Sequence, residues 1–161
     1  MSNLPSLGPR GEGWVAIQMV LFALIAISGL ALPGGWAGSA SVVTTGTGGL
    51  LILAGGALAV VGVLGLQESD ALTVVPHPRD DARLATTSIY GLVRHPIYGG
   101  LILGALGWAL VRASLAAGAG AAVLLVFFEL KRRREEAWLE ARFPGYVEYR
   151  DRTRRFIPWV L

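Results

Sequence analysis

Residues 13–67 read GWVAIQMVLFALIAISGLALPGGWAGSASVVTTGTGGLLILAGGALAVVGVLGLQ, and these 55 positions contain no Asp, Glu, Lys or Arg. Soluble domains carry about a quarter charged residues, so an uncharged stretch of this length does not fit one. A helix that crosses a bilayer, in contrast, needs about 20 apolar residues. The stretch therefore predicts an integral membrane protein that crosses the bilayer more than once.

A turn signal divides the uncharged stretch into two apolar runs. The first run, residues 14–32, ends at Pro33-Gly34-Gly35, a strong turn sequence. Small and polar residues follow over 36–46 and predict a loop, and the second run covers 47–66. We expect one membrane span in each run.

The second half of the chain contains two shorter uncharged runs around Arg112. Residues 95–111 and 113–128 lack charged side chains, and tilting or a snorkelling arginine can compensate for their modest length. We therefore predict an all-α bundle of four transmembrane helices in a single domain, 1–161, with spans at about 14–32, 47–66, 96–111 and 113–131. The last two spans form a hairpin, and a cytoplasmic helix follows. One long kinked helix in place of the hairpin would put the C-terminal tail on the other side.

The charge distribution indicates the orientation. If the four spans alternate, 13 of the 14 basic residues fall on one side and Arg112 alone on the other. The positive-inside rule then places both termini in the cytoplasm. The N-terminal segment lacks the pattern of a cleaved signal peptide and is expected to be retained. The chain has no cysteine, which excludes disulfides and thiolate ligands, and a net charge of +3 gives no reason to expect nucleic acid. We expect no metal site.

Polar side chains gather where the third span begins, in YGLVRHPIYGG, residues 90–100. Pro96 suits the first turn of a helix, where its missing N–H has no cost, so Arg94 and His95 precede the helix at the membrane surface. Free N–H groups at a helix start attract anions. An aromatic belt at the interface is the alternative for this segment.

A second polar cluster lies where the last span leaves the membrane. Residues 128–143 contain no glycine or proline and predict a continuation of the last helix. A spacing of four places Lys131, Glu135, Leu139 and Phe143 on one face, while Glu136 is expected to face solvent. The hairpin brings 94–98 and 131–136 to one membrane level, which predicts a functional site. Contact of 131–134 with anionic lipid headgroups is the alternative for the basic run.

The two clusters resemble a known family. The segment LATTSIYGLVRHPIYGG, residues 84–100, and the later pattern EEAWL-x-x-x-F, Y-x-x-Y and RFIP within 135–158 are similar to the isoprenylcysteine carboxyl methyltransferase family and to the related phospholipid N-methyltransferases. The resemblance covers roughly residues 65–161.

This resemblance implies a membrane enzyme that takes S-adenosylmethionine from the cytosol and a lipophilic substrate from the bilayer. It implies a cofactor region over about 83–98 and 129–158. The implied cofactor-binding residues are Arg83, Leu84, Ala85, Tyr90, His95, Pro96, Ile97, Tyr98 and Glu135. Lys131 corresponds to the basic residue that contacts substrate, where many relatives have arginine, and lysine lacks the bidentate fork for a carboxylate. Arg94 and Lys131 are the candidate catalytic residues, and Arg94 either holds the loop or meets the substrate's negative charge.

The expected function is S-adenosylmethionine-dependent methyl transfer, foremost to the carboxylate of an isoprenylcysteine-like or other lipid-linked substrate, otherwise to a lipid amine. One alternative is an NADPH-dependent membrane reductase of the sterol reductase type, although such enzymes have an acidic residue where this chain has Gly99-Gly100-Leu101. Another is a non-enzymatic small membrane protein, which would leave Glu135 and the paired motifs unexplained. The expected partners are the substrate and membrane lipids, and the oligomeric state stays open.

Overall fold

The protein is all-helical in the part of the chain that the structure describes. The structure is a computed structural model and describes all residues except 1–3, 70, 74, 76, 78–82 and 161. The elements are α1 (Glu12–Ala31), α2 (Ser39–Glu68), the 3-10 helix η1 (Ser88–Gly91), α3 (Pro96–Val111), α4 (Leu115–Arg142) and α5 (Tyr146–Arg152). The described residues form five α-helices and no strand, which confirms the predicted all-α class.

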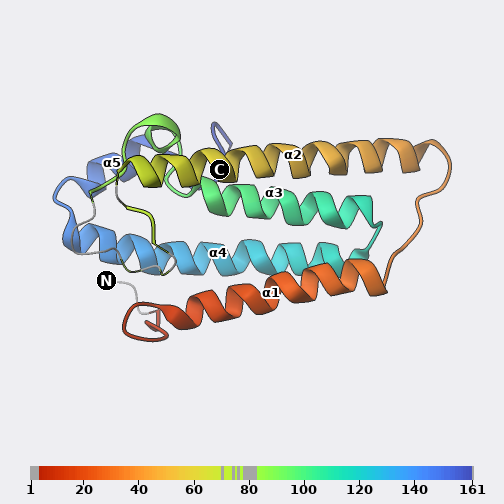
Figure 1. Ribbon diagram of the computed structural model, residues 1–161, viewed down its shortest axis with the longest axis horizontal. Coiled ribbons are helices and arrows are strands. Elements are labelled where there is room, and N and C mark those ends of the chain that lie inside the picture. Colours follow the sequence, from red (N-terminus) through yellow and green to blue (C-terminus); the bar gives the residue numbers. More distant parts are fainter. Residues whose placement is uncertain (1–3, 70, 74, 76, 78–82, 161) are drawn as a thin grey trace.

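The four long helices lie side by side along the long axis of the molecule (Figure 1). The links between α1 and α2 and between α3 and α4 lie at one end, and η1 and α5 lie at the other. A buried cluster joins α1, α3, α4 and the C-terminal segment; its members are Trp14, Ile25, Ile102, Leu124, Phe127, Phe128 and Phe156.

Two helices, α1 and α2, are long and apolar enough to cross a membrane, and α3 is a shorter apolar helix. Large apolar side chains on α1 and α2 are exposed, among them Leu24, Leu53 and Val60. Only 17% of the most apolar window of each helix is buried, so neither is the buried core helix of a soluble protein. These outer faces suit contact with lipid.

Glycines bring the backbones of α2 and α3 into close contact. A Cβ atom placed on Gly55 would lie 2.5 Å from the carbonyl oxygen of Gly100, and one placed on Gly48 would lie 2.7 Å from that of Gly107. Both distances are too short for a side chain. Small residues permit this approach between membrane helices, where the gain comes from van der Waals packing.

The glycine contact gives a first testable prediction. We expect Gly100→Ala to destabilise the protein by about 1–3 kcal/mol, because the added Cβ would lie 2.4 Å from the carbonyl oxygen of Gly55 and the backbones would have to separate. Gly104→Ala, on the same helix, is the matched control, since a Cβ there meets nothing within 4 Å. Thermal unfolding in detergent measures both, and equal midpoints for the two variants would contradict the prediction.

The helix ends agree with expectation in one half of the chain and differ in the other. Helix α3 begins at Pro96 and ends at Val111, as predicted, and α4 continues through Arg142. In the turn between them, Ser114 caps α4 by accepting a hydrogen bond from the Ala117 N–H. The predicted loop over 36–46 was wrong in its second part, because α2 already begins at Ser39. Its small and hydroxyl-bearing residues continue the helix instead of breaking it.

Backbone pairing closes the other end of the bundle. Val93 forms an isolated parallel bridge with Arg154. The Arg94 N–H donates to the Arg154 carbonyl oxygen at 2.9 Å, and the His95 N–H donates to the Arg155 carbonyl oxygen at 2.8 Å. The segment after α5 therefore fixes the residues that precede α3.

Candidate functional site

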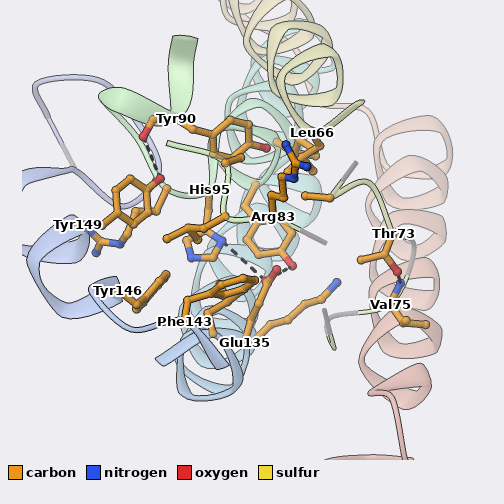
Figure 2. Close-up of a pocket in the computed structure, with 18 of the residues that line it drawn as sticks. Leu66, Thr73, Val75, Arg83, Tyr90, His95, Glu135, Phe143, Tyr146 and Tyr149 are labelled. Carbon is orange, nitrogen blue, oxygen red and sulfur yellow. Dashed lines mark hydrogen bonds and ion pairs between the residues drawn. The ribbon is translucent and has the colours of Figure 1, made fainter. Parts of the chain in front are cut away.

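A cavity of about 220 Å³ lies at the end of the bundle that carries η1 and α5. Side chains from all five α-helices and from η1 line it, together with residues between α2 and η1 and residues just before α3 (Figure 2). The lining residues are Gln18, Leu66, Ala71, Thr73, Val75, Arg83, Leu84, Ala85, Tyr90, Arg94, His95, Ile97, Tyr98, Leu101, Lys131, Glu135, Leu139, Phe143, Tyr146 and Tyr149.

The cavity brings together the residues that the sequence selected, with one exception. Every predicted site residue lines it except Pro96. Pro96 is buried and occupies the first turn of α3, and its ring packs against α2 at Gly62. The predicted face of α4, formed by Lys131, Glu135, Leu139 and Phe143, faces the cavity as a whole.

Glu135 is the carboxylate that faces the cavity. The Tyr98 hydroxyl donates a hydrogen bond to its Oε2 at 2.8 Å, and His95 Nδ1 lies 3.7 Å from the same oxygen. The rings of His95, Tyr98 and Phe128 stack in series, with centroid distances of 5.3 Å and 4.5 Å. These contacts leave Glu135 partly exposed, at 22% of its side chain, and able to accept a further hydrogen bond.

Glu136 is buried, so the prediction that it faces solvent was wrong. Its Oε1 accepts from Arg94 Nε at 2.9 Å and lies 3.1 Å from His95 Nε2. Its Oε2 accepts from Arg132 Nη1 at 2.8 Å. The structure therefore turns two adjacent glutamates inward, one toward the cavity and one toward a buried group of cations.

Arg94 joins this buried group to the C-terminal segment. Besides Glu136, its guanidinium donates to the carbonyl oxygens of Arg150 at 2.7 Å and Thr153 at 2.5 Å. Arg94 is 9% exposed. Its side chain reaches the cavity wall, yet its Nε and Nη1 donors already have partners within the protein.

Interactions with cations offset the effect of burial on Glu136. Burial alone would raise the pKa of this carboxyl, but the hydrogen bond and charge of His95, together with Arg94 and Arg132, lower it from 4.5 to about 2. A carboxylate whose pKa is lower in the folded protein than in the unfolded chain stabilises the fold above the unfolded value. That contribution is lost as the pH falls toward the folded value.

The pH dependence of stability tests this assignment. We expect the wild-type protein to lose on the order of 3 kcal/mol of stability from Glu136 as the pH falls from about 4.5 to about 2. The variant Glu136→Gln does not titrate and should show a shallower decline in thermal midpoint over that window. Parallel declines in the two proteins would contradict the assigned pKa.

Lys131 is buried at the α1 side of the cavity, so it is not available to lipid headgroups. The side chain is 4% exposed. Its Nζ donates to Gln18 Oε1 at 2.5 Å and lies 5.1 Å from the centre of the Tyr98 ring. Arg132 is likewise buried and pairs with Glu129 and Glu136. The headgroup interpretation therefore fails for these two residues.

Tyrosine hydroxyls complete the wall on the η1 and α5 side. Tyr90 donates to the Gly62 carbonyl oxygen at 3.1 Å, and Tyr149 donates to the Tyr90 carbonyl oxygen at 2.8 Å. The buried hydroxyl of Tyr146 has no hydrogen-bond partner in the part of the chain that the structure describes. Burial is the main cause that raises the pKa of all three phenols, which keeps them protonated at neutral pH.

Comparison with known families agrees with the geometry. Residues 43–145, which include α3, α4, nearly all of α2 and most of the cavity wall, match the phospholipid methyltransferase family. The chain belongs to this family. The phospholipid methyltransferase match confirms the resemblance seen in the two sequence motifs, and the two long apolar helices agree with a membrane-associated protein.

One curated relative carries a different description. The chain is 38% identical over 84 residues to the cobalt-zinc-cadmium resistance protein CzcN of Cupriavidus metallidurans. The alignment covers 50% of this chain and 38% of that protein, so the chain spans well under half the length of the relative. No solved structure matches the chain.

Three cavity residues lie outside the family match and were missed by sequence reasoning. Gln18 on α1 precedes the matched segment, and Tyr146 and Tyr149 follow it. Gln18 had a detectable signal, because it is the only amide in the first apolar run and polar groups within spans are rarely without a role. Tyr146 belongs to the quoted motif, but no pattern indicated its unpartnered hydroxyl.

Proposed function

We propose that this phospholipid methyltransferase family member uses S-adenosylmethionine to methylate a lipophilic acceptor, foremost the carboxylate of an isoprenylcysteine-like or other lipid-linked substrate, otherwise a lipid amine. One observation carries the proposal: Glu135, Tyr98 and His95, from the two sequence motifs, converge on one cavity. The family membership supports methyl transfer in general, and the cavity supports the place where it occurs.

The residues present fit this cofactor. S-adenosylmethionine carries a sulfonium, an ammonium group and a flat adenine. Glu135 offers a partly exposed carboxylate to a cationic group, and Arg83 offers a cation to the cofactor's carboxylate. Aromatic side chains such as Tyr98 and Phe143 offer ring faces to the sulfonium or the adenine. When bound, the cofactor supplies an electrophilic methyl group for an in-line displacement.

In such a reaction the residues of the chain mainly align the methyl donor with the acceptor and exclude water, because alignment supplies most of the rate enhancement. We propose that Arg83, Leu84 and Ala85 close the cavity from the loop side. His95 is held by Glu136 on one ring nitrogen and presents the other toward Glu135. No general base is needed for a carboxylate acceptor.

The two basic candidates receive different roles. The Nε and Nη1 donors of Arg94 are occupied by Glu136 and by two carbonyl oxygens, which favours a role in holding the loop over contact with substrate. Lys131 lies beside the cavity with Gln18 as its hydrogen-bond acceptor. Its ammonium is the group we assign to the acceptor side.

The proposed topology has four spans, α1 to α4, with the cavity, both termini and α5 at the cytoplasmic face. Basic residues lie overwhelmingly on that side of such a bundle. Arg112 lies at the opposite end, where its Nε donates to the Gly29 carbonyl oxygen at 2.9 Å. Accessibility labelling of single cysteines introduced at residues 37 and 160 in sealed vesicles would test the arrangement, and equal labelling from one side would overturn it.

A methyl-transfer assay tests the proposed activity. Purified protein is incubated with S-adenosylmethionine labelled in its methyl group and with prenylcysteine, phosphatidylethanolamine or a total lipid extract. Base-labile label in the lipid fraction indicates a methyl ester, and base-stable label indicates transfer to nitrogen or sulfur. His95→Ala should abolish the transfer. Absence of cofactor binding by calorimetry, together with binding of NADPH, would overturn the proposal in favour of a reductase.

A further inference from the structure

Tyr146 differs from the other tyrosines of this protein. The chain has four tyrosines, and all of them line the cavity. The hydroxyls of Tyr90, Tyr98 and Tyr149 each donate a hydrogen bond within the protein. The hydroxyl of Tyr146 is buried without a partner among the described residues, although the residue is only 1% exposed. Buried hydroxyls nearly always have partners, so each exception needs an explanation.

The surroundings of this hydroxyl restrict the kind of group that could satisfy it. Burial and the nearby charges of Glu136 and Glu135 raise the pKa of Tyr146, so the phenol stays protonated and acts as a donor. A negatively charged acceptor would be repelled by the same two carboxylates. A neutral oxygen or nitrogen atom is therefore the better match.

The neighbouring side chains favour a flat, uncharged ligand part. The ring of Tyr149 packs edge-on against Tyr146 at 5.8 Å. Figure 2 shows Phe143, Tyr146 and Tyr149 together on one side of the cavity, with Thr73 and Val75 on the opposite side. An aromatic wall of this kind suits a nucleobase and its ribose, since every base has a π-face for stacking.

We propose that the Tyr146 hydroxyl binds the nucleoside part of the cofactor by donating a hydrogen bond to a neutral atom of the adenine or the ribose. This rests on the proposed function, because it takes the cofactor to be S-adenosylmethionine. Tyr146 is then a cofactor-binding residue at the start of α5, just beyond the segment that matches the family. Cofactor binding would supply the acceptor that this hydroxyl lacks among the described residues.

The test compares Tyr146→Phe with Tyr149→Phe, a matched pair that removes one buried hydroxyl each. Without ligand, Tyr146→Phe should unfold at the wild-type temperature or above it, because no internal hydrogen bond is lost. Tyr149→Phe should unfold at a lower temperature, because the Tyr90 carbonyl oxygen loses its donor. With S-adenosylhomocysteine in calorimetry, Tyr146→Phe should weaken binding about three- to tenfold, the usual effect of one neutral hydrogen bond.

A second ligand tests which part of the cofactor the Tyr146 hydroxyl contacts. Methylthioadenosine keeps the nucleoside and lacks the amino acid, so Tyr146→Phe should weaken its binding by the same factor. Wild-type affinity in the variant, or a loss seen with S-adenosylhomocysteine alone, would overturn the nucleoside contact. Failure of the wild-type protein to bind either ligand would instead overturn the proposed function, and the two results are distinct.

Discussion

Replacing Glu136 by alanine is expected to lower the free energy of unfolding by about 3–5 kcal/mol, because it leaves buried cations without their common counter-charge. Glu136 is 6% exposed and accepts from both Arg94 and Arg132. Its loss also frees His95 Nε2 and with it the orientation of the ring beside Glu135. The measurement is the thermal midpoint in detergent, followed by cofactor affinity.

Glu140→Ala is the matched control for this substitution. Glu140 lies one turn further along α4 and pairs with Arg150 at 3.2 Å, but its side chain is 46% exposed. Exposed pairs contribute at most about 1 kcal/mol, so the control should unfold close to wild type. A Glu136→Ala protein as stable as Glu140→Ala would show that the buried ion group does not hold this end of the bundle together.

Replacing Glu135 by glutamine is expected to weaken S-adenosylmethionine binding by about 10- to 100-fold with little loss of stability. The substitution keeps the shape of the side chain and can still accept from Tyr98, but it removes the charge that faces the cavity. Hydrogen bonds to charged groups contribute about 1.5–3 kcal/mol, which corresponds to this range. Calorimetry with the purified protein provides the affinity.

Tyr98→Phe separates the effect of the Glu135 charge from the effect of the hydrogen bond that Tyr98 donates to it. This variant keeps the Glu135 carboxylate and the stacked ring between His95 and Phe128 but loses the 2.8 Å hydrogen bond that holds the carboxylate. Its affinity should fall less than that of Glu135→Gln. Equal affinity for wild type and Glu135→Gln would remove Glu135 from the cofactor site.

The sequence predicted the elements that local signals determine. Pro96 at a helix start and Arg112 after an apolar run defined α3 to the residue, and the glycine-free segment after Phe128 predicted the extension of α4. The start of α2 was missed because serine, threonine and glycine occur both in loops and in membrane helices. In a bilayer these residues need no polar surroundings as long as their helical hydrogen bonds are made.

The sequence predicted which residues line the site, but it did not predict the hydrogen bonds and ion pairs that connect them. Helical spacing placed Lys131 and Glu135 on the cavity face, and both line it. The same spacing placed Glu136 in solvent, because the periodicity of one helix cannot show that Arg94 and His95, which precede α3, contact its second face. The pairing of Lys131 with Gln18 depends on contact between α1 and α4, more than 100 residues apart in sequence.

The bonds that Arg94 makes with the segment after α4 set an order of assembly during synthesis. The carbonyl oxygens of Arg150 and Thr153 accept hydrogen bonds from its guanidinium. The carbonyl oxygens of Arg154 and Arg155 accept hydrogen bonds from the backbone N–H groups of Arg94 and His95. All these acceptors are translated more than 50 residues after Arg94. A nascent chain therefore holds an unfinished site until α5 and the residues that follow it, through Arg155, have left the ribosome. By the same reasoning, a fragment limited to residues 43–145 would contain the family's sequence pattern but lack the groups that lock Arg94 in position.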